Sequence, residues 1–222
     1  MSVVLAVAPH PDDETLGYGG TLLRHRAEGD QIHWLIVTAV SPEFGWSAQR
    51  MAERATAIDN MAADYSFASV TQLGLPTARL DTLPLSDLVA TVAQVIETIR
   101  PDTVYTPHSG DVHSDHRLVF QAVAAATKTF RSPYVRRLLV CEIQSETDFA
   151  VQPDRLPFQP NVFVDITPYL SRKIALLSHF ASEMGVFPFP RSAEAIRALA
   201  MCRGAQAGVA AAEAFMLLKE IR

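Results

Sequence analysis

The chain has 222 residues, of which 49% are hydrophobic and 19% charged, and its formal net charge is −5 at pH 7. This length and balance are typical of one globular domain and exclude a disordered or fibrous protein. The Lys and Arg residues are scattered along the chain and form no dense basic stripe, which argues against nucleic acid as a partner.

The first elements along the chain form a predicted β-α-β unit. Residues 3–8 and 32–38 are continuous apolar runs, as in central parallel strands. Between them, residues 16–28 carry apolar side chains at helical spacing and end at Gly29. The first run has no basic flank and is too short to span a bilayer, so we interpret it as a buried strand and not as a signal peptide.

Strands and helices continue to alternate downstream. We predict helices at 47–63, 85–99 and 116–130, and strands at 70–73, 103–105 and 137–143. The last third is predicted to hold a short strand at 162–164 and helices at 168–182, 192–203 and 207–221. The alternation predicts an α/β fold with a mostly parallel sheet, helices on both faces and extra C-terminal helices, in a single domain over residues 1–222.

The cysteines and the apolar segments bear on the compartment. Cys141 and Cys202 are far apart and form no C-x-x-C motif, which fits a reducing cytosol and argues against a thiolate metal site. Both are expected to be small buried side chains. We therefore expect a cytoplasmic protein with no membrane span, and the sequence leaves open whether it forms a homo-oligomer.

Charged residues gather in the loop that follows the first strand. In open α/β sheets, ligands bind outside the carboxyl ends of the strands, so this loop and the loop after residues 103–105 share one functional edge. The first loop contains His10, Asp12, Asp13 and Glu14. Because positions three apart lie on one side of a helical turn, His10 and Asp13 can face a common ion while Asp12 projects elsewhere.

The second loop contains three of the seven histidines, His108, His113 and His116. His113 and His116 are again three positions apart. If both bound the ion together with His10 and Asp13, the site would have four protein ligands, as structural zinc sites do, whereas catalytic zinc keeps three and a water. We therefore assign one of the two histidines to the metal and leave the other free for proton transfer.

This ligand count indicates hydrolysis of an amide-type carbonyl. Zinc lowers the pKa of a bound water and polarises a carbonyl, but a separate base and acid must move the protons. Asp12 suits the base role and the free histidine the acid role, with Asp115 or Asp111 accepting the second N–H of that imidazole. Zn²⁺ is the expected ion, and Fe²⁺ would accept the same set of two histidines and one aspartate.

The motifs resemble those of the PIG-L/LmbE-like family of zinc-dependent N-acetylglucosaminyl deacetylases. Residues 9–14 (Pro-His-Pro-Asp-Asp-Glu) match its first motif and residues 113–117 (His-Ser-Asp-His-Arg) its second. Further matching pieces at 50–53, 73–76, 100–102, 203–204 and 212–215 extend the similarity over nearly the whole chain.

The resemblance implies a Rossmann-like fold and hydrolysis of the N-acetyl group of an acetamido sugar or sugar conjugate, giving acetate and a free amine. It also implies roles for individual residues. The implied metal ligands are His10, Asp13 and His116. Asp12 corresponds to the general base, His113 to the general acid that also stabilises the oxyanion, Asp115 to the partner of His113, and Arg50 to an arginine that holds the sugar.

Sugar recognition is where the chain departs from the family pattern. Many members carry an aspartate in the third loop where this chain has Thr77, Ala78 and Arg79, and some carry a tyrosine where it has Asp111. Trp46, with Phe44, is a candidate to stack on a sugar ring or aglycone. Arg117 either binds substrate or pairs with Asp115. Arg203 and Glu213 are expected to form a structural ion pair between the terminal helices.

Two other functions compete with N-deacetylation. A metal-dependent hydrolase of esters or phosphoesters would favour an arginine or lysine cluster or two metal ions, and near the motifs only Arg117 and Arg50 are available. A non-catalytic sugar-binding module would be expected to lack Asp12 or His113, and both are present. The residues therefore favour the deacetylase.

Overall fold

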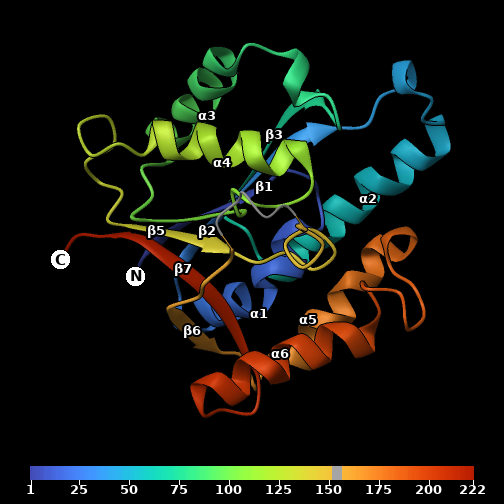
Figure 1. Ribbon diagram of the computed structural model, residues 1–222. Helices are drawn as coiled ribbons and strands as arrows, with labels where there is room; N and C mark the ends of the chain where they lie inside the picture. Colours follow the sequence, from blue (N-terminus) through green and yellow to red (C-terminus); the bar gives the residue numbers. More distant parts are fainter. Residues whose placement is uncertain (152–156) are drawn as a thin grey trace.

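One seven-stranded sheet organises residues 1–151 and 157–222, the part of the chain that the computed structural model describes (Figure 1). Its strand order is β3-β2-β1-β4-β5-β7-β6. Strands β1 to β5 pair in parallel, whereas β7 is antiparallel to both β5 and β6. The mostly parallel sheet is therefore confirmed. The strands are β1 (Val3–Ala8), β2 (Gln31–Ala39), β3 (Ser69–Pro76), β4 (Thr103–Thr106), β5 (Arg137–Cys141), β6 (Val162–Asp165) and β7 (Ala212–Glu220).

Helices cover both faces of the sheet, as alternation along β1 shows. Val4 and Ala6 pack in one core with α1 and α2, while Leu5 and Val7 pack in the other with α3 and α4. Because successive strand residues point to opposite faces, a strand buried on both sides must be apolar throughout. The helices are α1 (Asp13–Glu28), α2 (Ala48–Tyr65), α3 (Leu85–Ile99), α4 (Ser114–Ala126), α5 (Leu170–Leu176) and α6 (Ala193–Ala207), with short 3-10 helices η1 (Pro42–Phe44), η2 (Leu80–Thr82) and η3 (Leu177–Glu183).

The predicted terminal helix at 207–221 is wrong. Helix α6 ends at Gly208, which adopts a left-handed φ of 73°, and the chain then enters β7. Ala, Glu, Leu and Met favour a helix in isolation, but this segment fills the gap between β5 and β6, and its first four residues are buried. Tertiary pairing therefore overrides local propensity.

The expected Arg203–Glu213 pair is also wrong, because each residue has another partner. Arg203 donates to both carboxylate oxygens of Glu142, at 2.6 Å each. Glu213 accepts from the Lys173 ammonium at 2.7 Å and from the backbone N–H groups of Gly20 and Thr21. Glu213 therefore ties β7 to α5 and to the middle of α1.

Two smaller expectations can also be checked. Cys141 is buried, but Cys202 is exposed on α6, so the prediction that both are buried is wrong for Cys202. In the described ranges, no helix combines the length and apolar character needed to cross a membrane.

Candidate metal centre and active site

The two histidine-containing loops meet because their strands are neighbours. β1 pairs in parallel with β4, and the strand order reverses between them, since β2 and β3 lie on one side and β5 on the other. Such a switch point opens a crevice at the carboxyl ends of the strands. The loops after β1 and β4 both open there.

Three of the predicted site residues converge in this crevice. His10, Asp13 and His116 each offer one ligand atom, and these atoms lie within 4.8 Å of one another. The Asp13 Oδ2 atom is 3.2 Å from His10 Nδ1 and 3.3 Å from His116 Nε2. The set that the family resemblance implies as metal ligands is therefore brought together in space.

The buried polar atoms of this group fit a cation. Asp13 Oδ1 and His116 Nε2 are buried, and neither has a hydrogen-bond partner within residues 1–151 and 157–222. Unpaired buried polar atoms are costly, and a coordinated ion would satisfy both. On the far side of the ring, His116 Nδ1 donates to Asp111 Oδ2 at 2.9 Å, which turns Nε2 into the crevice.

Without a metal ion, protons on His10 and His116 balance the negative charge of the neighbouring carboxylates. Burial lowers the pKa of His116, but the Asp13 and Asp111 carboxylates outweigh it and raise that pKa to about 10. For His10, Asp115 and Asp13 likewise outweigh burial and raise the pKa to about 9. Burial disfavours the Asp13 carboxylate, yet the histidines hold its pKa well below the usual value. Protons on the two imidazoles thus supply the positive charge that a metal ion would bring.

Asp12 lies beside this group in an unusual backbone conformation. Its φ of 137° is rare for a residue with a side chain, and the residue is only 3% exposed. Its carboxylate makes no capping hydrogen bond to α1, which leaves it available for chemistry. Burial and the charge of Asp13 raise the pKa of Asp12 to about 7, while Arg191 acts in the opposite direction.

His113 lies beside His10, with the two ring centroids 4.5 Å apart. Its Nδ1 accepts the backbone N–H of Asp115 at 3.1 Å, which assigns the proton of the neutral ring to Nε2. Burial, together with the charges of His10 and His116, lowers the pKa of His113 to about 4. The ring is therefore a neutral hydrogen-bond donor at pH 7.

Within the described residues, the Asp115 carboxylate makes no hydrogen bond to the His113 ring, although the sequence predicted one. Its Oδ2 lies 3.1 Å from His10 Nε2, while the backbone N–H groups of Ala78 and Leu80 donate to the same carboxylate at 2.7 and 3.3 Å. Asp115 therefore orients His10, with His10 Nδ1 turned toward Asp13. The third loop, which lacks the family aspartate, contributes through its backbone, since Ala78 adopts a left-handed φ of 56°.

Arg191 reaches the site from the C-terminal third, and the sequence analysis missed it. It lies between η3 and α6, and its Nη1 donates to Asp12 Oδ2 at 3.1 Å. Its neighbours Pro190 and Ser192 indicate only a loop and a helix start, so no local signal points to a functional role. The contact exists only in the folded chain.

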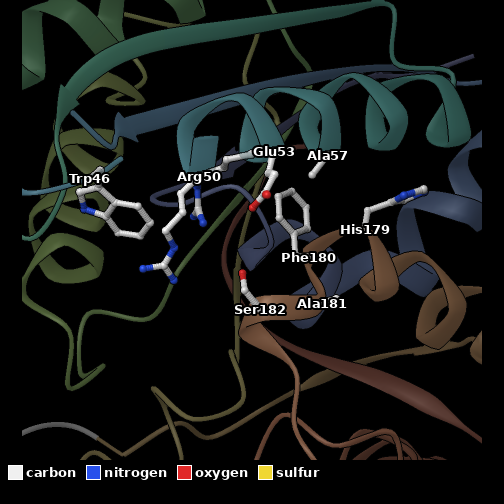
Figure 2. A pocket seen from close by; sticks show the side chains of 9 residues that line it. Trp46, Arg50, Glu53, Ala57, His179, Phe180, Ala181 and Ser182 are labelled. Carbon is white, nitrogen blue, oxygen red and sulfur yellow. The ribbon is translucent and has the colours of Figure 1, made fainter. Parts of the chain in front are cut away.

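The candidate substrate residues fall into two groups. Trp46 and Arg50 line a cavity of about 240 Å³ between the start of α2 and the segment around Phe180, and the Arg50 guanidinium carbon lies 5.0 Å from the indole centroid (Figure 2). Phe44 lies outside this wall, under the Arg79 guanidinium. Arg117 donates to the backbone carbonyls of Asp111 and Val112, so its observed bonds support the second loop.

Another group with metal-ligand chemistry lies near the opposite ends of the strands. His25, Glu28 and Asp30 bring potential ligand atoms within 4.8 Å. His25 Nδ1 bonds to Asp30 at 2.7 Å and its Nε2 to the Tyr105 hydroxyl at 2.9 Å. Both ring nitrogens of His25 are therefore engaged. Within the described residues, no buried side-chain atom of this group lacks a hydrogen-bond partner, unlike Asp13 Oδ1 and His116 Nε2 in the crevice.

The fold and the crevice together define a Rossmann-like α/β protein with a candidate His-Asp-His metal centre at the topological switch point. The family profile described as GlcNAc-PI de-N-acetylase matches residues 5–127. The chain belongs to this PIG-L family.

Individual relatives support the assignment. The chain is 27% identical to a 1D-myo-inositol 2-acetamido-2-deoxy-alpha-D-glucopyranoside deacetylase of Mycolicibacterium vanbaalenii, over 85% of this chain and 83% of that protein. The conserved protein TT1542 of Thermus thermophilus superposes with a TM-score of 0.80 at 28% identity, covering 100% and 97% of the two chains. N,N'-diacetylchitobiose deacetylase of Pyrococcus horikoshii shares the fold, with a TM-score of 0.75 at 19% identity and coverage of 97% and 83%.

Proposed function

We propose that this protein is a metal-dependent N-deacetylase that hydrolyses the N-acetyl group of an acetamido sugar or sugar conjugate. Family membership supports the reaction class. The observation that carries the proposal is a pair of buried atoms that have no hydrogen-bond partner within the described residues, Asp13 Oδ1 and His116 Nε2, next to the buried carboxylate of Asp12. These groups supply an ion-binding set and a base in one crevice.

His10, Asp13 and His116 would hold the ion, with Zn²⁺ as the expected metal and Fe²⁺ as an acceptable one. When bound, such an ion polarises the amide carbonyl and makes water a better nucleophile. Side chains of the protein orient the ligands and transfer the protons. Asp111 and Asp115 fix the rings of His116 and His10, so that each presents one nitrogen to the crevice.

Asp12 is the proposed general base. Its pKa of about 7 places it close to the pH at which a base is both available and strong enough to take a proton. It takes one proton as water adds to the carbonyl carbon. The cleaved amine needs one proton, so the water is fully accounted for in acetate and the free amine.

His113 is the proposed oxyanion donor and acid. The neutral ring offers its Nε2–H to the carbonyl oxygen as negative charge develops there. That charge favours a second proton on the ring, which would be the proton that Asp12 took from the water, and the resulting imidazolium gives a proton to the departing nitrogen. Because the pKa of His113 lies near 4, this imidazolium is a strong acid.

The cavity beside Trp46 is the proposed place for the rest of the substrate. Its polar lining includes the Trp46 indole, the guanidinium groups of Arg50 and Arg54, the Glu53 carboxylate and the Ser182 hydroxyl (Figure 2). Such a lining suits a ring that carries hydroxyl groups. The Mycolicibacterium relative is named for an acetamido sugar attached to inositol. We therefore propose an acetamido sugar joined to a second polar ring.

A substrate panel tests this function. Acetate release should be measured, with bound zinc quantified, from N-acetylglucosamine, its inositol conjugate and N-acetylated amines that lack a sugar. We expect release from the acetamido sugars, with the conjugate preferred. Hydrolysis of aryl ester or phosphoester probes, with no acetate from any acetamido sugar, would favour the alternative hydrolase. Sugar binding without turnover by the metal-loaded protein would favour a binding module.

If the cavity holds the second ring of the substrate, a change at Trp46 should weaken substrate binding. In Trp46→Ala, loss of stacking on a polar ring, at about 0.5–1.5 kcal/mol, should raise KM for the conjugate about 2- to 10-fold with little change in kcat. Trp46→Phe is the matched control and should retain most of the affinity. An unchanged KM in Trp46→Ala would remove the cavity from substrate binding.

A further inference from the structure

The Arg191 side chain is enclosed by acidic groups from three separate segments. Its guanidinium lies 3.1 Å from Asp12, 3.2 Å from Glu146 and 3.9 Å from Glu183, and the side chain is only 15% exposed. Buried charges are retained only where partners compensate their desolvation. Arg191 therefore occupies one defined place, between the loop after β5, the end of η3 and the start of α1.

Two of its bonds fix the guanidinium independently of Asp12. Nε donates to Ser145 Oγ at 2.7 Å, and Nη2 donates to Glu146 Oε1 at 3.2 Å. Ser145 adopts a left-handed φ of 73°, which belongs to the turn that presents both acceptors. Because the guanidinium is planar and rigid, anchoring two of its nitrogens determines where the third one points.

The third nitrogen, Nη1, points at Asp12. Within the described ranges, Arg191 is the one residue that donates a hydrogen bond to the Asp12 carboxylate. The backbone of Asp12 is held separately, since its N–H donates to Glu14 Oε2 at 3.1 Å. A residue with a φ of 137° persists only where its surroundings hold it there.

We propose that Arg191 is a positioning residue that aims the Asp12 carboxylate at the attacking water. It acts through Asp12 and contacts no substrate atom. The loop after β5 serves as the anchor, so the geometry of the base depends on a segment distant in sequence from both histidine motifs. This inference rests on the proposed function, in which Asp12 is the base.

A double-mutant cycle tests the coupling between the two residues. Misplacement of a catalytic group by about 1 Å can cost roughly 100-fold in rate, so Arg191→Met should lower kcat about 10- to 100-fold while KM changes less than about twofold. In the Asp12→Asn background, the same substitution should have almost no further effect. Arg191→Lys, which keeps the charge but loses the fork, should recover only part of the rate.

Controls separate positioning from a general loss of structure. Bound zinc and the thermal midpoint should be measured for every variant, and Arg197→Met on the exposed face of α6 should behave as the wild type. If Arg191→Met does not fold, Arg191→Lys carries the cycle. An equal loss in both backgrounds, a rise in KM alone, or an unchanged kcat would each overturn the proposal.

A structural readout keeps this inference distinct from the proposed function. A crystal structure of Arg191→Met, or of Arg191→Lys, should show the Asp12 carboxylate turned away from its wild-type position, whether or not any acetamido sugar is a substrate. An unmoved carboxylate would overturn the positioning role. Absence of acetate release by the wild type, with a displaced carboxylate in the variant, would instead overturn the proposed function.

Discussion

At the scale of single residues, the crevice balances three carboxylates against protons on two histidines. Asp13 and Asp111 flank His116, and Asp115 and Asp13 flank His10. These contacts hold both imidazoles in their charged form without an ion. A divalent cation must displace those protons, so metal binding and proton binding compete at the same atoms.

This competition predicts opposite pH trends for the metal-free and metal-bound protein. The pKa values of His10 and His116 rise from 6.5 to about 9 and about 10 on folding. Their contribution to stability is therefore fully present below pH 6.5 and is lost as pH rises through about 9 to 10. For the chelator-treated protein, urea unfolding should show that the free energy of unfolding falls as the pH rises from 6.5 to about 10. The affinity for zinc should rise over the same pH interval.

The matched control is His116→Gln, which removes one of the two charged rings. Its metal-free form should lose much of the pH dependence, and its zinc affinity should be weak at every pH. Zinc affinity that stays constant between pH 6.5 and 9 in the wild type would contradict the competition.

At the scale of elements, β7 shows how packing overrides local signals. Its residues were predicted as helix because alanine, glutamate and leucine favour one, yet Gly208 ends α6 and the chain turns into the sheet. Glu213 then faces α1, where it accepts from the N–H groups of Gly20 and Thr21 and pairs with Lys173. The helix that begins at Asp13 is thus tied to the last strand.

That buried pair predicts a large effect on stability. Lys173 and Glu213 are 5% and 4% exposed, so Glu213→Ala would leave an unpaired buried ammonium and should cost about 3–5 kcal/mol of the free energy of unfolding. Urea denaturation measures this cost. The double variant Lys173→Met/Glu213→Leu should recover part of it, because neither charge then remains.

An exposed pair provides the comparison. The Arg24–Glu28 ion pair is 44% and 51% exposed, so Glu28→Ala should cost less than about 1 kcal/mol. Similar losses in Glu28→Ala and Glu213→Ala would mean that burial of the Lys173–Glu213 pair contributes nothing.

The strands and helices that position the site were largely readable from the sequence. Apolar runs bounded by polar loops identified β1, β2 and β4, and helical spacing identified α3 with the observed bounds. His10, Asp13 and His116 were assigned because their loops follow strands and match family motifs. Contacts between distant segments carry no such local pattern, which is why Arg191 and the partner of Asp115 were missed.

At the scale of the whole molecule, the strand order explains why one crevice collects these residues. The order reverses between β1 and β4, so the loop holding Asp12 and the loop holding His113 open at the same edge. The C-terminal third adds Arg191. It also adds one wall of the Trp46 cavity (Figure 2). The candidate metal ligands therefore come from the two N-terminal motifs, while the surroundings of Asp12, the proposed base, depend on the complete fold.

The most direct test is Asp12→Asn, a nearly isosteric change, with bound zinc and acetate release from an N-acetylglucosamine conjugate measured on the same sample. Because His10, Asp13 and His116 remain, the variant should bind as much zinc as the wild type. Loss of the base should lower kcat by about 10²- to 10⁴-fold. A fully metal-loaded variant that releases acetate at the wild-type rate would contradict the account.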